Sequence, residues 1–97
     1  MKIKILPSAI EDLYEGRVFY EKQGGEIGDY FLDSLFSDID SLALYGGIHP
    51  VHSGYHRMLS KRFPYAVYYK IEEVRTVVVR RVLDLRQNPY RLRKKLT

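Results

Sequence analysis

With 97 residues, the chain is long enough for one domain, 1–97, that buries roughly 60–65% of its unfolded surface and folds without covalent cross-links. It contains no cysteine, which excludes disulfides and thiolate metal sites. The first apolar stretch ends at Pro7 and is too short for a signal peptide or a membrane span, so we expect a soluble, cytoplasmic protein.

The formal net charge of +4 is unevenly distributed along the chain. Residues 1–50 hold four Lys/Arg and nine Asp/Glu, a net charge of −5, whereas residues 51–97 hold twelve and three, a net charge of +9. Such a split suits a basic surface that binds nucleic acid or an acidic protein segment. It also suits acidic helices that cover a basic sheet, with charges that serve solubility, and charge alone favours this second interpretation.

The sequence opens with a predicted strand and a predicted helix. Lys2 to Leu6 alternates in the manner of a strand with one buried face, and Pro7 ends it. Ser8 and Glu11 have the spacing of a capping box, which predicts a helix that runs to about Gln23. The apolar positions at helical spacing are Ile10, Leu13, Tyr14 and Val18, with Glu11, Asp12, Glu15 and Glu21 mostly on other faces.

A second helix is predicted from Glu26 to about Leu44, after a break at Gly24-Gly25. The short glycine connection indicates an antiparallel pair of helices. The predicted core stripe is Ile27, Phe31, Leu35, Ile39 and Leu42, widened by Leu32 and Phe36, with Asp29, Asp33 and Asp40 in solvent.

The second half of the chain is rich in strand signals. After a loop with three glycines, three strands are predicted at 57–60, 65–71 and 76–83, the last two as a hairpin. The predicted fold is therefore α+β in the order β-α-α-β-β-β. We expect a small antiparallel-rich sheet with the two-helix hairpin packed on one face and the first strand beside a later one.

Several classes of site receive no support. His49, His52 and His56 are spaced by three and four residues, but no acid or cysteine completes a ligand set on this Gly/Pro loop, so we interpret them as solvated and predict no metal. The chain also lacks a nucleophile elbow, a phosphate loop and a dinucleotide fingerprint, and we predict no cofactor.

Arginines and tyrosines alternate through the basic half. Arginine binds phosphate with two donors and tyrosine stacks on bases, so the set suits RNA, but it suits an acidic amphipathic peptide equally well. Arg80 and Arg81 are neighbours on a strand and are expected on opposite faces, so they cannot form one clamp. The candidate binding residues are Arg57, Arg62, Tyr65, Tyr68, Arg81, Arg86, Arg91 and Arg93.

The order of motifs resembles the ParE/RelE superfamily of toxins from type II toxin–antitoxin systems. The resemblance rests on Arg57-x-Leu59, on Phe63-Pro64-Tyr65 leading into AVYYKI, and on VVVRRVLDLRQNP. The opening strand, the Pro7-led start of the first helix and the two-helix hairpin also fit, so the resemblance covers essentially the whole chain. Each motif is degenerate alone, and their order and spacing make the resemblance fairly specific.

The resemblance leaves two activities open. RelE-like members are ribosome-dependent mRNA endonucleases that use basic residues and a tyrosine, which in this chain would be Arg86 and Tyr90. Such nucleases commonly carry an arginine where this chain has Ala66. ParE-like members instead poison DNA gyrase by binding. If the protein belongs to this branch, it is not expected to be an enzyme.

The ParE-like branch is favoured by FPYAVYYKI and RVLDLRQNP, although Asp84 and Gln87-Asn88 depart from the His and Arg-Asp of that pattern. The resemblance implies a cognate antitoxin with an acidic amphipathic segment as a partner, together with gyrase or with the ribosome and mRNA, and no membrane. A third possibility is a degenerate toxin that only binds its antitoxin. Arg91 to Lys95 is interpreted as a solvated basic tail.

Overall fold

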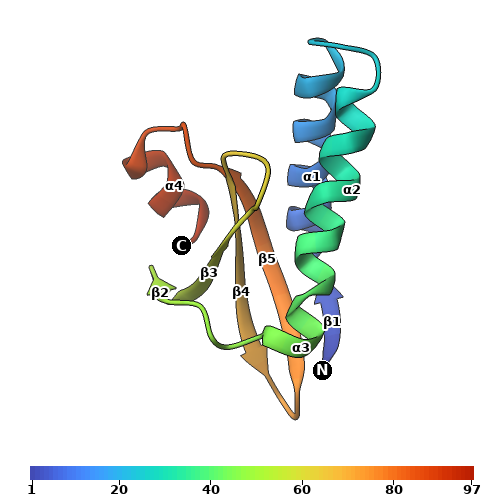
Figure 1. Ribbon diagram of the computed structural model, residues 1–97. Helices are drawn as coiled ribbons and strands as arrows, with labels where there is room; N and C mark the ends of the chain where they lie inside the picture. The colour runs from blue at the N-terminus through green and yellow to red at the C-terminus, as the bar shows by residue number, and fades with distance from the viewer.

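The computed structural model describes all residues, 1–97, as one five-stranded sheet with helices on both sides (Figure 1). The sheet order is β1-β5-β4-β3-β2; β1 runs parallel to β5 and the other neighbours are antiparallel. In chain order the elements are β1 (Lys2–Ile5), α1 (Pro7–Glu21), α2 (Ile27–Asp40), α3 (Leu42–Tyr45), β2 (Val51–His52), β3 (Tyr55–Leu59), β4 (Tyr65–Glu72), β5 (Thr76–Asp84) and α4 (Pro89–Lys95).

The predicted α+β fold is confirmed, including the helical hairpin on one face and the first strand beside a later one. Figure 1 shows α1 and α2 on one side of the sheet and α4 on the other. The main core lies under the hairpin and includes the fully buried Leu13, Phe31 and Val79. A smaller core lies under α4. Side chains of β4 point alternately to the two faces of the sheet and so contribute to both cores: Tyr69 faces the hairpin and Tyr68 faces α4.

The predicted capping box is wrong. The helix begins at Pro7 with Leu6 as its N-cap, and no side chain caps it. The Ser8 hydroxyl instead donates to the backbone carbonyl of Arg80 at 2.7 Å. Proline is well suited to the first helical position, since its missing N–H would have no partner there. Ser8 is thereby free to bond the sheet.

The predicted second helix is divided in two. α2 ends at Asp40 and α3 continues from Leu42, while the Ser41 hydroxyl donates to the carbonyl of Asp38 at 2.6 Å. The expected solvent exposure of Asp29 and Asp33 is confirmed. Two further elements, the two-residue β2 in the histidine loop and α4, were not predicted.

The inner face of α1 differs from the predicted one. Tyr14 and Val18 are each 50% exposed, although the sequence pattern placed them in the core. Asp12 and Tyr20 are buried instead, each 7% exposed. The helix is rotated so that the Asp12 carboxylate faces the sheet.

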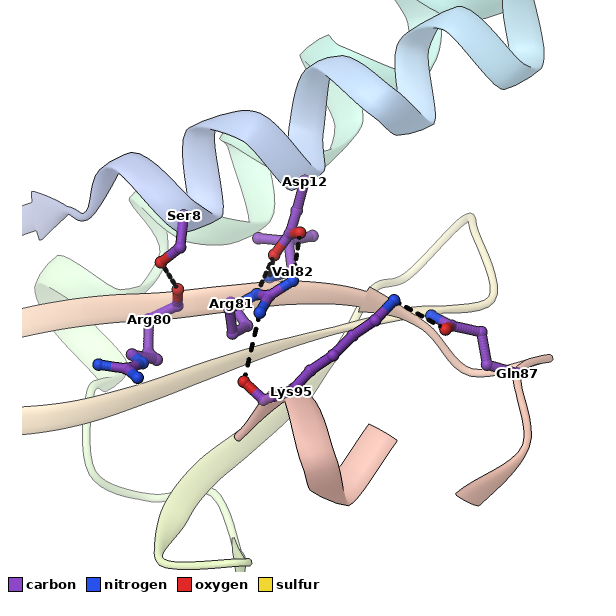
Figure 2. Close-up of polar contacts among 7 residues, drawn as sticks. All are labelled: Ser8, Asp12, Arg80, Arg81, Val82, Gln87 and Lys95. Carbon is purple, nitrogen blue, oxygen red and sulfur yellow. Dashed lines mark hydrogen bonds and ion pairs between the residues drawn. The ribbon is translucent and has the colours of Figure 1, made fainter. Parts of the chain in front are cut away.

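The edge of β5 is hydrogen-bonded by α1 side chains beyond the point where β1 stops. The pairing of β1 ends at Ile5 opposite Val79. Further along β5, Ser8 bonds the Arg80 carbonyl and an Asp12 carboxylate oxygen accepts the backbone N–H of Val82 at 2.9 Å (Figure 2). Residues four apart lie on one helix face, so these two side chains replace a neighbouring strand.

A close approach at Gly16 joins α1 to the core. A Cβ at this position would lie 2.5 Å from Cζ and 2.6 Å from Cε2 of Phe31, which is fully buried. The Phe31 ring cannot retreat, because it contacts the rings of Tyr20, Phe63 and Tyr65 with centroids 4.8–5.2 Å away. α1 therefore requires glycine here.

Gly16→Ala is expected to lower the free energy of unfolding by about 1–2 kcal/mol in urea denaturation. Overpacking costs about 1–3 kcal/mol, and the higher helix propensity of alanine offsets at most about 1 kcal/mol. Gly25→Ala is the control, since a Cβ there meets nothing within 4 Å. An equal effect of both substitutions would contradict the close packing of Gly16 against Phe31.

Candidate functional site

Three of the predicted binding residues form a row across the sheet beneath α4. Arg57 in β3 is the register partner of Tyr68 in β4, and Tyr68 is the partner of Arg81 in β5. Tyr68 is only 3% exposed because Leu92 and Leu96 of α4 pack into the same small core. Stacking of a base on Tyr68 would therefore require α4 to move.

Arg81 is engaged in an internal ion pair. Its Nε donates to Asp12 at 2.7 Å and its Nη2 donates to the other oxygen of the same carboxylate at 2.8 Å. The hydrogen bond to Asp12 raises the pKa of Arg81 above its ordinary value. Nη1 also lies 3.3 Å from the backbone carbonyl of Lys95 (Figure 2). Arg81 thus joins α1, β5 and the end of α4.

The orientation of Arg81 depends on a β-bulge. Tyr68 pairs with Arg81 but Tyr69 pairs with Val79, so Arg80 has no partner across the β4–β5 ladder. In Figure 2 the Arg80 side chain leads away from α1, whereas the Arg81 guanidinium turns toward Asp12. As expected, the two arginines do not form one clamp. The strict alternation of side chains along a regular strand, from which this was predicted, is interrupted here by the bulge.

A pocket of about 240 Å³ lies between α4 and the β2–β3 hairpin. Arg57 and Arg93 line it, no acidic residue does, and Arg57 Nε is buried without a hydrogen-bond partner. A pocket lined by two arginines and no acidic residue is chemically suited to one oxyanion such as a phosphate or a carboxylate. The pocket is lined by His52, Ser53, Arg57, Tyr68, Pro89, Leu92, Arg93 and Leu96.

Arg86 lies at the other end of β5 and is held by Asp84. Its Nε and Nη2 donate to the two carboxylate oxygens at 2.9 and 2.7 Å, and its backbone N–H donates at 2.9 Å. The guanidinium carbon lies 5.2 Å from the ring centre of Phe19 and 5.9 Å from that of Tyr20, within the range of cation–π contacts. Arg86 is oriented by neighbours in its own chain.

The pKa values of this group follow from the same contacts. Burial would raise the pKa of Asp84, but hydrogen bonds from Arg86 outweigh it and leave the pKa below its ordinary value. Burial, and then the charge of Asp84, raises the pKa of Tyr65 to about 12. Tyr65 therefore keeps its proton near neutral pH, and it is only 6% exposed.

The remaining predicted residues are dispersed. Arg62 is exposed in the β3–β4 turn, and Arg91 is exposed on α4. Tyr90 is 57% exposed, with Lys94 Nζ 5.2 Å from its ring centre. Ala66, at the position where RelE-like nucleases commonly carry arginine, is fully buried under α4.

The interpretation of the C-terminal segment as a solvated tail is corrected. Asn88 Oδ1 accepts the N–H of Tyr90 at 2.8 Å and caps α4, with Pro89 in the first turn. Leu96 is 5% exposed and anchors the segment on the sheet. The positive charges of Arg91 to Lys95 are exposed as expected, but the backbone that carries them is a docked helix.

The interpretation of the histidines as solvated is correct only for His52. His49 and His56 are half-buried, because both contact the buried Tyr69.

No helix in the structure is both long and apolar enough to cross a membrane. The contacts that sequence reasoning missed are those of Asp12, Asp84 and Tyr69.

Comparison with known proteins yields a structural match alone. No protein-family model and no curated protein matches the sequence. A chain of the solved structure described as "Chromosomal ParDE TA system from P. aeruginosa" superposes with a TM-score of 0.75 at 18% identity. The superposition covers 88% of this chain and 96% of that chain. The protein therefore has the ParE/RelE-like fold that its sequence predicts.

Proposed function

We propose that the chain is a ParE-like toxin of a type II toxin–antitoxin system. In this proposal it acts in the cytoplasm, inhibits DNA gyrase by binding, and is neutralised by a cognate antitoxin. The fold shared with a chain of a ParDE system supports the toxin class. The state of Arg86 supports action by binding, and it is the observation on which the choice of mechanism rests.

Arg86 is poorly placed to serve as a nuclease residue. Asp84 occupies the Nε/Nη2 edge of its guanidinium, at 2.9 and 2.7 Å, and offsets its charge, so a phosphate would have to compete with a carboxylate in the same turn. Ala66 stands where RelE-like nucleases commonly carry a second arginine. Its side chain has no hydrogen-bond donor and is fully buried. Stabilising the charged transition state of RNA cleavage requires donors aimed at the reacting phosphate.

One observation favours the RelE-like alternative, a ribosome-dependent mRNA endonuclease. The pocket with Arg57 and Arg93 has no internal anion, and Arg57 Nε has no partner. Phosphate contacts position nucleic acid without performing chemistry on it. The pocket thus supports anion binding, and a toxin that retains only binding to its antitoxin uses the same surface.

The antitoxin is proposed to be an acidic amphipathic segment. Its charge would complement the +9 half of the chain, which raises the association rate and specificity more than the affinity. Exposed apolar side chains of α3, of the loop that follows it, and of β2 and β3 offer contacts for its apolar face. These side chains are Leu44, Tyr45, Ile48, Val51 and Leu59.

Expression of the chain alone in bacteria is expected to stop growth, because free toxin meets its target. Plasmid DNA isolated from these cells should lose negative supercoiling while the mRNA stays intact, and co-expression of the cognate antitoxin should restore growth. Arg75→Ala, which alters an exposed arginine in the β4–β5 turn, is the control and should behave like the wild type. Unimpaired growth would count against the toxin proposal.

A further inference from the structure

A buried tyrosine and two histidines meet at the edge of the sheet. We call Gly47, His49, His56 and Tyr69 the Tyr69 cluster. Tyr69 is fully buried; its hydroxyl accepts the backbone N–H of Gly47 at 2.9 Å and lies 2.5 Å from His49 Nδ1. The His56 ring stacks on the Tyr69 ring, with centroids 5.0 Å apart and planes inclined by 22°. His56 Nδ1 lies 2.7 Å from the backbone carbonyl of His49.

The hydrogen-bond network assigns the protons of the cluster. A carbonyl only accepts, so His56 Nδ1 carries a hydrogen and donates it to His49. The Tyr69 oxygen already accepts from Gly47, and its own buried hydrogen needs an acceptor. The only cluster atom that can accept it is His49 Nδ1. His49 is therefore neutral, with its hydrogen on Nε2.

Protonation of His49 is incompatible with this arrangement. A hydrogen on Nδ1 would face the Tyr69 hydroxyl as a second donor, and the tyrosine hydrogen would lose its acceptor. Protonation of His56 would add a charge but keep its Nδ1 hydrogen bond. Burial, and then the nearby His56, lowers the pKa of His49 below the ordinary 6.5, in agreement with the geometry.

The adjoining pocket has more positive than negative groups to face a charged His49. His49 lines a pocket of about 450 Å³ together with Tyr45 and the charged residues Asp38 of α2, Arg57 of β3 and Lys61 of the β3–β4 turn. The Asp38 carboxylate accepts the Ser60 hydroxyl at 2.7 Å and keeps its negative charge. Arg57 and Lys61 outnumber it and would repel a charged His49.

The loop from Gly46 to Pro50 depends on this contact. Besides the Tyr69 cluster, the loop is bonded to the sheet where the Pro50 carbonyl accepts the N–H of Arg57 at 2.9 Å. Ile48, within the loop, is 73% exposed and adds little packing. The His49–Tyr69 hydrogen bond is thus one of three side-chain attachments of this pocket wall, and the only one whose acceptor, His49 Nδ1, becomes a donor on protonation.

We propose that the Tyr69 cluster makes this loop a pH-sensitive device, attached to the sheet while His49 is neutral and released when His49 is protonated. Release would open the pocket wall and loosen β2, which follows the loop directly. The direction in which stability changes with pH follows from the lowered pKa of folded His49. Below pH 6.5 the native state binds fewer protons than the unfolded chain. Acidification therefore removes stability, until the pH is below the folded pKa.

Amide hydrogen exchange tests the proposal on the full chain, without reference to its target. Between pH 7.5 and pH 5 the protection factors of the Gly47 and Arg57 amides are expected to fall severalfold. The Leu6 amide, bonded to Val79 at 3.0 Å on the opposite edge of the sheet, should keep its protection. Protection factors correct for the intrinsic pH dependence of exchange.

Two asparagine variants separate the cluster from general acid effects. In His49→Asn the side-chain oxygen stands one bond from Cγ, as Nδ1 does, and can still accept from Tyr69 but does not titrate. The fall in protection should therefore disappear while protection at pH 7.5 remains. His52→Asn replaces an exposed histidine of β2 and should retain the fall. Unchanged protection of Gly47 and Arg57 across the pH range would overturn the proposal. So would an equal fall in wild type and His49→Asn.

Discussion

Replacing Asp12 with alanine is expected to lower the free energy of unfolding by about 3 kcal/mol, a large part of the stability of a domain this size. The Asp12 carboxylate accepts from Arg81 Nε at 2.7 Å, Arg81 Nη2 at 2.8 Å and the Val82 N–H at 2.9 Å. Its loss leaves a guanidinium and a backbone donor unpaired. The expected loss of stability lies at the lower end of the range for removing one partner of a buried ion pair, because the Arg81 side chain is 21% exposed.

Urea denaturation measures this effect, with Glu15→Ala as the matched control. Glu15 is an exposed carboxylate one turn further along α1, and its replacement should change stability by less than about 0.5 kcal/mol. Asp12→Asn should fall between the two, since its amide oxygen can still accept from Val82 but carries no charge. Equal midpoints for Asp12→Ala and Glu15→Ala would show that the Asp12–Arg81 contact does not hold α1 to β5.

The role of Asp12 explains why the inner face of α1 was mispredicted. Periodicity counts apolar residues, and a carboxylate four residues after Ser8 appears as part of a solvated face. The structure turns this face inward because β1 ends at Ile5 and leaves β5 with unpaired backbone groups. The length of one strand, which sequence pattern determines poorly, thus decides the rotation of the neighbouring helix.

The arginine pair shows a second limit of sequence reasoning. A period of two places Arg80 and Arg81 on opposite faces, but a bulge inserts Arg80 as an extra residue opposite the Tyr68–Tyr69 step. Nothing in VVVRRVL indicates a bulge. The order and type of the main elements were predictable, because the strands of the second half have strong β propensity and the helices are long enough to show their period.

α4, in contrast, carried signals in its sequence. Asn88-Pro89 is a favourable N-cap and first helical position, and Leu92 and Leu96 are four residues apart. The basic residues that suggested a solvated tail are also the residues that favour the C-terminal end of a helix dipole. A basic cluster is therefore weak evidence against regular structure.

The second large effect concerns the target. Purified chain added to a supercoiling reaction is expected to abolish introduction of supercoils by DNA gyrase once it is in excess over the enzyme. Binding is expected because exposed cations, among them Arg62 and Arg91, remain without an internal partner, whereas Arg81 and Arg86 are committed to Asp12 and Asp84. Arg75→Ala again serves as the control, because Arg75 lies in the β4–β5 turn, at the end of the sheet away from the β3–β4 turn and α4 (Figure 1).

In the proposed function the protein acts by binding and cuts no RNA. Parallel titration of the chain into a gyrase supercoiling reaction and into a translating extract that contains a defined mRNA tests it most directly. The proposed function, supported by Arg86 held by Asp84 and by the buried Ala66, predicts loss of supercoiling and full-length mRNA. Cleavage of the mRNA by the wild type, absent with Arg86→Ala and accompanied by unimpaired gyrase, would contradict it.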